Sequence, residues 1–171
     1  MTTLWMKAAS FAAHKHRNQV RKDGKTPYIA HPFRVAMIVR DLFGVNDEEV
    51  LAAALLHDTI EDTDTDYDDI ADAFGERVAD LVGALTKDMR LPDHKRETAY
   101  DRQLAEGPWE ARLIKLADVL DNITDASHEK MIRKASSKVV RAIKLAENDE
   151  ELSGAVQVVK EFAEALMVVE V

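Results

Sequence analysis

The stretch Leu51–Thr63, LAAALLHDTIEDT, indicates both the fold class and the chemistry of this chain. Its first six residues are apolar and form a helix readily. His57-Asp58 and then Glu61-Asp62 follow, so four groups that bind metal ions or move protons lie within six consecutive residues. If the helix continues, side chains four apart share a face, and His57 lies above Glu61. Asp58 then lies above Asp62. Because unpaired acids are costly at the end of a buried helix, this pattern indicates a functional site.

Helical periodicity recurs on both sides of this stretch and predicts an all-α fold of about eight to nine helices. Six glycines and four prolines punctuate the chain, and no strong hairpin signal lies between alternating runs. A basic loop with Gly24 and Pro27 is expected over 18–30, and Pro32 suits the first position of the next helix, beside His31. The expected helices are 4–16, 32–44, 46–58, 66–74, 78–85, 93–106, 109–125, 130–147 and 150–169.

The length and composition suit a single compact helical domain. With 171 residues and 19.2 kDa we expect one domain over 1–171, its motifs within about 11–125 and helices over 130–169 closing it. There is no cysteine, which excludes disulfides, thiolate nucleophiles and cysteine-ligated metal centres. No apolar run of about 18 residues and no signal-peptide pattern is found, so we expect a cytoplasmic protein that binds no membrane.

Charge is distributed unevenly along the chain. Residues 1–40 contain eight Lys or Arg and one acid, a net +7, whereas the whole chain carries −9 and the remainder therefore −16. The overall charge argues against a nucleic-acid partner. A basic zone on an acidic protein suits a small polyanion that the local field draws to one site. The alternative is a solvated basic helix face.

Four candidate metal ligands lie in three well-separated segments. They are His31 in PYIAHP, His57 and Asp58 in LLHDTIEDT, and Asp118 in IKLADVLDN. Two imidazoles and two carboxylates make a donor set that suits manganese, iron, zinc or nickel. Asp118 follows an apolar helical run, where a buried carboxylate needs a partner such as a metal. Alone, His31 is typical of a helix cap and Asp118 of a salt bridge, but together the four predict one divalent-metal centre.

The segments RKDGKTPYIAHP, LAAALLHDTIEDT, VADLVGALTK and IKLADVLDN resemble the HD-domain metal-dependent phosphohydrolases. Within them, the chain is most similar to the RelA/SpoT-type hydrolase domain and to the stand-alone small alarmone hydrolases. The resemblance runs from about Phe11 to Asp125. It implies removal of the 3′-pyrophosphate from guanosine 3′,5′-bispyrophosphate, (p)ppGpp, an alarmone of the stringent response, giving GDP or GTP and pyrophosphate. It implies Mn²⁺ as the usual ion, with Zn²⁺, Fe²⁺ or Ni²⁺ as alternatives.

The resemblance also implies roles for site residues. His31, His57, Asp58 and Asp118 match the family's metal ligands. The acidic pair Glu61 and Asp62 matches the residues that activate or orient the attacking water. An alternative role for Asp62, four residues after a ligand, is to orient a ligating histidine.

Substrate contacts are implied in the same way. Asn122 matches a residue that holds the substrate beside the metal, and Arg21 matches one that contacts its phosphates. Arg21 suits a forked phosphate contact, while Lys22 and Lys25 assist as point charges. Tyr28, near the expected metal edge, is a candidate for contact with the nucleobase.

Three positions depart from the family pattern. Val119 and Thr124 stand where members carry basic residues, and Asp121 stands where an aromatic residue or histidine is more frequent. Fewer positive charges predict weaker phosphate binding or another preferred nucleotide. Two alternatives therefore stay open: an HD phosphohydrolase acting on another nucleotide, and a metal-bound nucleotide sensor without turnover. Helices at both ends also offer packing surface for a homo-oligomer.

Overall fold

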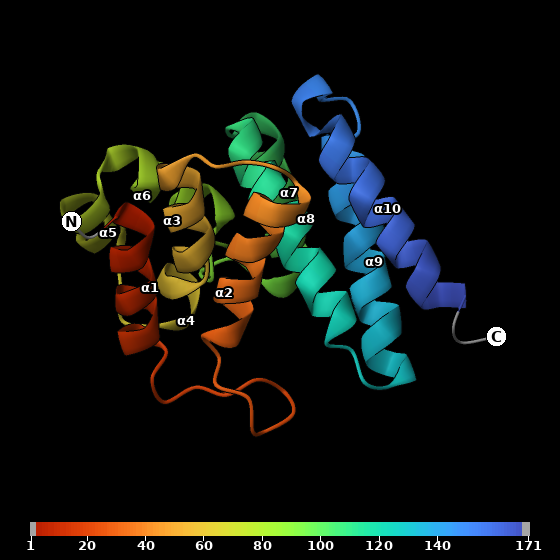
Figure 1. The fold of residues 1–171 in the computed structure, drawn as a ribbon, viewed down its shortest axis with the longest axis horizontal. Coiled ribbons are helices and arrows are strands. Elements are labelled where there is room, and N and C mark those ends of the chain that lie inside the picture. The colour runs from red at the N-terminus through yellow and green to blue at the C-terminus, as the bar shows by residue number, and fades with distance from the viewer. Residues whose placement is uncertain (1–2, 169–171) are drawn as a thin grey trace.

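The computed structural model describes residues 3–168, and every regular element in that range is a helix (Figure 1). The all-α fold predicted from the sequence is therefore confirmed. Residues 1–2 and 169–171, including Val169 at the expected end of the last helix, lie outside the described residues. The elements are α1 (Leu4–Lys15), α2 (Ala30–Met37), the π-helix η1 (Ile38–Leu42), α3 (Glu48–Leu56), α4 (Thr59–Asp62), α5 (Tyr67–Phe74), α6 (Glu76–Leu85), α7 (Asp93–Glu106), α8 (Trp109–Thr124), α9 (Glu129–Ala146), the 3₁₀ helix η2 (Glu150–Leu152) and α10 (Ser153–Val168).

Within the described range, nine of the α-helices have eight or more residues, in agreement with the predicted number, and α4 has four. Local signals position several of their ends. Asp47 caps α3 by accepting hydrogen bonds from the N–H groups of Glu49 and Val50. Asp66 and Asp69 form a capping box at α5. Gly75, which ends α5, has a φ of 94°, a backbone conformation that favours glycine.

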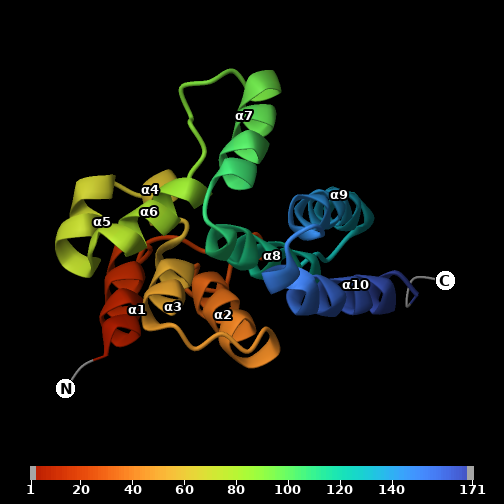
Figure 2. The ribbon, with the colours of Figure 1, turned by 90° about the horizontal axis from the view of Figure 1, so that it is seen from above.

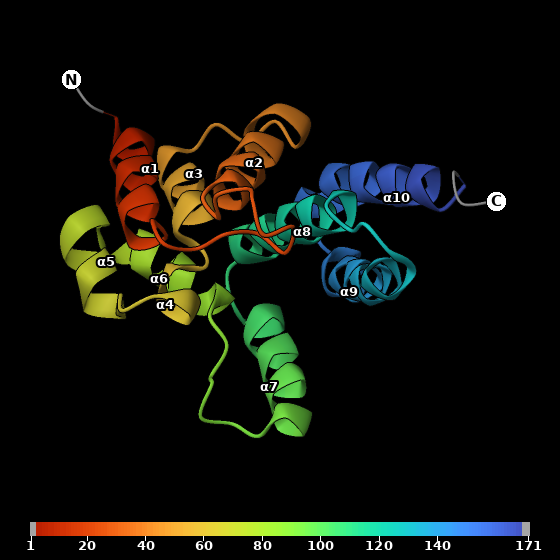
Figure 3. The ribbon, with the colours of Figure 1, turned by 90° about the horizontal axis from the view of Figure 1, so that it is seen from below.

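Two central helices organise the core. Every residue of α3 from Val50 to Leu56 is buried, and this helix packs against α1, α2 and α6. Helix α8 packs against α2 on one side and against α9 and α10 on the other. Figure 2 shows α8 between the α1–α3 group and the α9–α10 pair, and Figure 3 shows α7 projecting away from α1–α3. The beginning of α2, the end of α3 and the middle of α8 therefore meet within one core.

The helix carrying the HD dipeptide does not continue as expected. Helix α3 ends at Leu56, His57 and Asp58 form a turn, and α4 starts at Thr59. At this end the His57 ring nitrogen Nδ1 hydrogen-bonds to the Ala54 carbonyl, and the Thr59 hydroxyl donates to the Leu56 carbonyl. These side chains satisfy carbonyl groups that a continuing helix would have bonded through its backbone.

The second helix also begins earlier than the sequence predicts. Helix α2 begins at Ala30, two residues before Pro32, so His31 lies inside its first turn. Proline is tolerated there because the first helical N–H groups have no partner within the helix. Within residues 3–168, no helix combines the length and the apolar character needed to cross a membrane.

Candidate active site

The four candidate metal ligands meet where α2, the turn after α3, and α8 converge. Nε2 of His31 lies 3.5 Å from Oδ2 of Asp58 and 3.2 Å from Oδ1 of Asp118. Nε2 of His57 lies 3.1 Å from the same Asp58 oxygen and 3.9 Å from the same Asp118 oxygen. Segments 27 and 60 residues apart in the sequence thus place two imidazoles and two carboxylates around one point.

The other ring nitrogen of each imidazole, Nδ1, already has a hydrogen-bond partner. Nδ1 of His31 lies 2.6 Å from Oδ2 of Asp121, and Nδ1 of His57 lies 2.8 Å from the Ala54 carbonyl. These acceptors fix the rings so that each Nε2 faces the two aspartates. Nε2 of His57 is buried and makes no hydrogen bond with any residue of the described range 3–168. A buried nitrogen of this kind, held by a partner on its other side and facing carboxylates, fits a metal ligand.

Electrostatics at this centre favour positive charge. Burial lowers the pKa of His31, but hydrogen bonds with Asp118 and Asp121 outweigh it and raise the pKa to about 9. Burial raises the pKa of Asp58, but the neighbouring His57 outweighs it, so the carboxyl stays ionised. The carboxylates of Asp58 and Asp118 therefore favour a cation beside the histidines, as a divalent-metal site requires.

Tyr28 joins two acidic residues of the site. Its hydroxyl lies 2.7 Å from Oδ2 of Asp58 and 3.1 Å from Oδ2 of Asp62. Its ring stacks on His16, with 4.8 Å between the ring centroids. The hydroxyl therefore orients Asp58, while the nucleobase contact expected for Tyr28 stays a prediction.

The acidic pair lies beside the ligands. Glu61 and Asp62 both line the cavity described below, and Glu61 accepts a hydrogen bond of 3.2 Å from the N–H of Lys87. Partial burial and the charge of Asp58 raise the pKa of Asp62. A carboxylate with a raised pKa accepts a proton more readily than an ordinary one, which suits a group that works on water.

A chain of hydrogen bonds connects the N-terminal loop to the candidate metal ligands. Arg21 donates to Oδ1 of Asn122 at 2.9 Å and to Oδ2 of Asp125 at 3.0 Å. Asn122 in turn donates to Oδ1 of Asp118 at 2.5 Å. Lys22 lines the cavity as expected, whereas Lys25 is not among its lining residues. Arg21 and Asn122 thus reach the ligand centre through hydrogen bonds.

These groups surround an open cavity of about 790 Å³. It is bounded by the N-terminal loop, the α3–α4 turn, and parts of α7, α8 and α9. Its lining residues are Val20, Arg21, Lys22, Tyr28, His31, His57, Asp58, Glu61, Asp62, Leu85, Lys87, Tyr100, Lys115, Asp118, Asn122 and Lys138.

Sequence reasoning missed six of these residues, the apolar Val20 and Leu85 and four residues with polar side chains. Lys115 donates to Oδ2 of Asp118 at 2.6 Å, and its position three residues earlier on the same helix was a usable signal. Lys87 ends the quoted segment VADLVGALTK, but its spacing from the ligands says nothing about contact. Tyr100 and Lys138 lie on α7 and α9, outside every motif, and only tertiary packing brings them to the cavity.

The three departures from the family pattern have different surroundings. Val119 is 1% exposed and belongs to the hydrophobic core, so its side chain does not line the cavity. Thr124 is exposed and donates to the Asp121 carbonyl. Asp121 is buried, and binds both His31 and Arg34. An acidic residue at this position therefore orients a candidate ligand.

Comparisons with known proteins agree on one family. An HD domain model matches residues 8–145. Guanosine-3′,5′-bis(diphosphate) 3′-pyrophosphohydrolase MESH1 of Mus musculus is 49% identical over 121 residues, which cover 70% of this chain and 68% of the relative. Guanosine-3′,5′-bis(diphosphate) 3′-pyrophosphohydrolase of Aquifex aeolicus is 46% identical over 121 residues, covering 68% of this chain and 17% of that protein.

A solved structure extends the similarity beyond the motifs. It is described as a metazoan ortholog of SpoT that hydrolyzes ppGpp and plays a role in starvation responses. It superimposes with a TM-score of 0.80 at 31% identity, covering 93% of this chain and 94% of that one. The match therefore includes the helices that follow the motif-bearing part.

Proposed function

This chain belongs to the HD-domain family, and from that premise we propose that it hydrolyses guanosine 3′,5′-bis(diphosphate) at its 3′-diphosphate. The products are GDP and pyrophosphate, or GTP and pyrophosphate from the pentaphosphate. Relatives at 46% and 49% identity carry this activity in their names, and the superimposed metazoan protein hydrolyzes ppGpp. The observation that carries the proposal is the meeting of His31, His57, Asp58 and Asp118 beside two further acids in one cavity.

We infer that His31, His57, Asp58 and Asp118 hold one divalent ion. The support is the bound Nδ1 on each ring, the unbonded Nε2 of His57, and the two ionised carboxylates. A divalent ion at such a site polarises a phosphoryl oxygen and lowers the pKa of bound water toward about 7. We propose Mn²⁺ as the working ion, because nitrogen and carboxylate oxygen together suit it, although zinc binds such sets with greater affinity.

Glu61 and Asp62 are the proposed proton acceptors for the attacking water. Water oxygen forms a bond to the phosphorus attached to the ribose 3′-oxygen, and the bond from that phosphorus to the 3′-oxygen breaks. The water proton passes to a carboxylate, and the departing 3′-oxygen gains a proton. Asp62, with its raised pKa and its position beside Tyr28, is suited to hold that proton. Its alternative role, to orient a ligating histidine, would act through Tyr28 and Asp58.

Basic residues of the N-terminal loop are the proposed phosphate contacts. Arg21 uses Nε and Nη2 for Asp125 and Asn122, and within residues 3–168 its Nη1 has no hydrogen-bond partner. This geometry leaves one edge of the guanidinium for a phosphate oxygen while Asn122 keeps it beside Asp118. Lys22 contributes a point charge at the cavity, and Lys25 contributes through the local field.

The direct test is product analysis of purified protein incubated with ppGpp and Mn²⁺. Chromatography should show GDP and pyrophosphate appearing in equal amounts, with no free phosphate. In ¹⁸O-water the label should enter pyrophosphate and not GDP, because the attack is on phosphorus. Unchanged ppGpp with folded, metal-loaded protein would reject the proposal.

The same protein preparation tests two alternative functions, hydrolysis of another nucleotide and binding of a nucleotide without turnover. A nucleotide panel in which another compound is turned over much faster than ppGpp would favour a different substrate, for which Val119 and Thr124 are the motivation. Recovery of intact nucleotide after tight binding would favour a sensor. Glu61 and Asp62 in the cavity argue against a sensor, because binding alone does not require a proton acceptor.

The domain organisation, the cellular location and the class of substrate are part of the proposal. We propose one domain over 1–171 that acts in the cytoplasm, in the stringent response, on a small guanosine polyphosphate and not on nucleic acid. The net charge of −9 supports the last point, because a polyanionic duplex would be repelled. A homo-oligomer stays a prediction, for which size measurement in solution is the test.

A further inference from the structure

Five basic side chains line the cavity, and three of them are already paired. Arg21 pairs with Asp125, Lys87 with Glu97 at 3.0 Å, and Lys115 with Asp118 at 2.6 Å. The other two, Lys22 of the N-terminal loop and Lys138 of α9, make no ion pair with any residue of the described range 3–168. They enter the cavity from different elements.

We propose that Lys138 binds the 5′-diphosphate of the substrate, the group that stays on the product GDP. This inference rests on the function proposed above. A substrate with diphosphates on both the 3′ and 5′ oxygens needs two anion sites in one cavity. The group that is cleaved must lie at the four metal ligands, so the other diphosphate needs cations that are not already engaged there.

The position of Lys138 suits the second site. Helix α9 packs along α8, which carries Asp118 and Lys115. Lys115 touches the ligand Asp118, whereas Lys138 lies within 4 Å of no carboxylate oxygen in the described chain. Lys138 is therefore a cation of the cavity wall and not part of the ligand centre.

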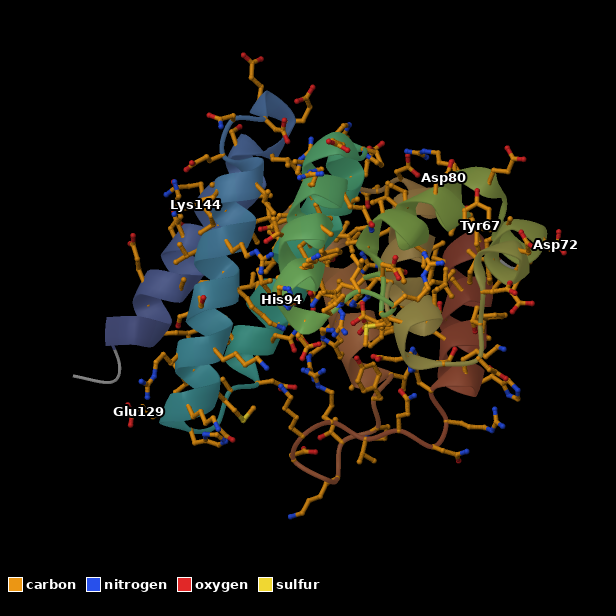
Figure 4. The ribbon with its side chains drawn as sticks, turned by 180° about the vertical axis from the view of Figure 1, so that it is seen from behind. Tyr67, Asp72, Asp80, His94, Glu129 and Lys144 are labelled. Carbon is orange, nitrogen blue, oxygen red and sulfur yellow. The ribbon has the colours of Figure 1, made fainter. Side chains whose placement is uncertain are left out.

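The cavity has additional room on this side. A second space of about 330 Å³ lies between α7, α8 and α9, and shares Lys87, Tyr100, Lys115 and Lys138 with the main cavity. Figure 4, viewed from behind, shows α7 and α9 side by side in front of α8. The wall formed by these helices is thus basic and continues beyond the metal ligands.

The charges around Lys138 are mutually repulsive. Lys138 is exposed overall, but partial desolvation and the neighbouring Lys115, Lys87 and Lys134 lower its pKa, despite an opposing effect of Asp118. A bound diphosphate would offset this repulsion by placing negative charge among the lysines. The same basic wall explains how the cavity retains positive charge although positions 119 and 124 are neutral.

The test compares Lys138→Met with Lys144→Met, which removes the same charge from the outer surface of α9 (Figure 4). Lys144 is exposed and does not line the cavity. With ppGpp, Lys138→Met should raise KM about 10-fold, the loss expected for one charge-assisted hydrogen bond at an open site, and leave kcat within about 2-fold. Lys144→Met should match the wild type, and Lys138→Arg should restore most of the lost affinity.

A shortened substrate identifies which diphosphate Lys138 contacts. With guanosine 3′-diphosphate carrying a free 5′-hydroxyl, Lys138→Met and the wild type should have equal KM. An equal loss on both substrates would place Lys138 at the cleaved group and overturn the proposal. No loss on ppGpp would overturn it as well.

Binding of GDP separates this inference from the proposed function. Calorimetry with metal-loaded protein should show GDP binding about 10-fold more weakly to Lys138→Met than to the wild type, with guanosine bound equally. If the wild type does not turn over ppGpp, the proposed function fails, and the GDP comparison still decides the role of Lys138. Equal GDP affinity in the two proteins, both folded by circular dichroism, would overturn it.

Discussion

Nδ1 of His31 lies 2.6 Å from Oδ2 of Asp121, and this carboxylate also forms a two-point contact with Arg34. Asp121 is 2% exposed, so Arg34 and His31 together satisfy a buried acid. Because Asp121 holds Nδ1 of His31, the other ring nitrogen, Nε2, faces Asp58 and Asp118. A residue that departs from the family pattern thus orients a candidate metal ligand.

The first prediction concerns this pair. Asp121→Asn keeps the size of the side chain but removes the charge that orients His31. Metal affinity should fall about 10- to 100-fold, as for other residues that hold a ligating histidine. Asp125→Asn is the control, because Asp125 binds Arg34 but makes no contact with His31. Metal titration by calorimetry measures both variants, and equal affinities would show that Asp121 has no orienting role.

The second prediction separates metal binding from proton transfer. Glu61→Gln should keep the bound metal and lower kcat about 10²- to 10⁴-fold, because the amide cannot accept the water proton. Asp58→Ala should instead lose both metal and activity. Metal content per chain and single-turnover rates give the comparison. Loss of metal from both variants would contradict the assignment of Glu61.

The third prediction is a pH dependence of stability at the α7 wall. Partial burial raises the pKa of Glu97, but Lys87 and Arg141 outweigh it and hold the pKa below its usual 4.5. The folded pKa is depressed, so the ion pairs stabilise the fold above pH 4.5. This stabilisation is lost as the pH falls through the folded pKa.

Glu97→Gln tests this prediction. Urea unfolding at pH 7 should show the variant less stable than the wild type, and the difference should shrink steadily below pH 4.5. Because the Glu97 side chain is 47% exposed, solvent screens the ion pairs and the effect at pH 7 should be about 1 kcal/mol or less. A difference that stays constant from pH 7 to pH 3 would show that the ion pairs are not its source.

The fourth prediction concerns the start of α5, where the capping residue Asp66 does not line the cavity. Asp66→Ala removes the capping box of α5 and should lower the free energy of unfolding by about 0.5–2 kcal/mol. Activity and metal content below the unfolding transition should equal those of the wild type. Thermal unfolding and a turnover assay on the same sample provide both values. An unchanged thermal unfolding midpoint would contradict the prediction, because it would mean that water binds the freed N–H groups of α5 without loss of stability.

Short-range patterns explain why most of the fold could be predicted from the sequence and why the candidate metal ligands could be named. Capping residues such as Asp47 and Asp66 and breakers such as Gly75 act within a few residues, so helix ends follow from sequence. The ligand motifs are equally local. The interruption after Leu56 was missed because it depends on how the His57 and Thr59 side chains bond to nearby carbonyls.

Residues that reach the site through tertiary packing were not predictable. No spacing relates Lys138 or Tyr100 to the ligands, because α7 and α9 bring them to the cavity by packing against α8. The contact between Tyr28 and Asp58 likewise depends on the path of a loop without regular periodicity. The pairing of Arg21 with Asn122 spans 101 residues and leaves no local signal.

The central claim is that His31, His57, Asp58 and Asp118 hold one divalent ion, and anomalous diffraction tests it most directly. Crystals grown with Mn²⁺ should show a single strong anomalous peak per chain at the manganese absorption edge. It should lie within bonding distance of both Nε2 atoms and of one oxygen from each aspartate. A peak elsewhere in a preparation that hydrolyses ppGpp, with these four side chains turned away from it, would contradict the account.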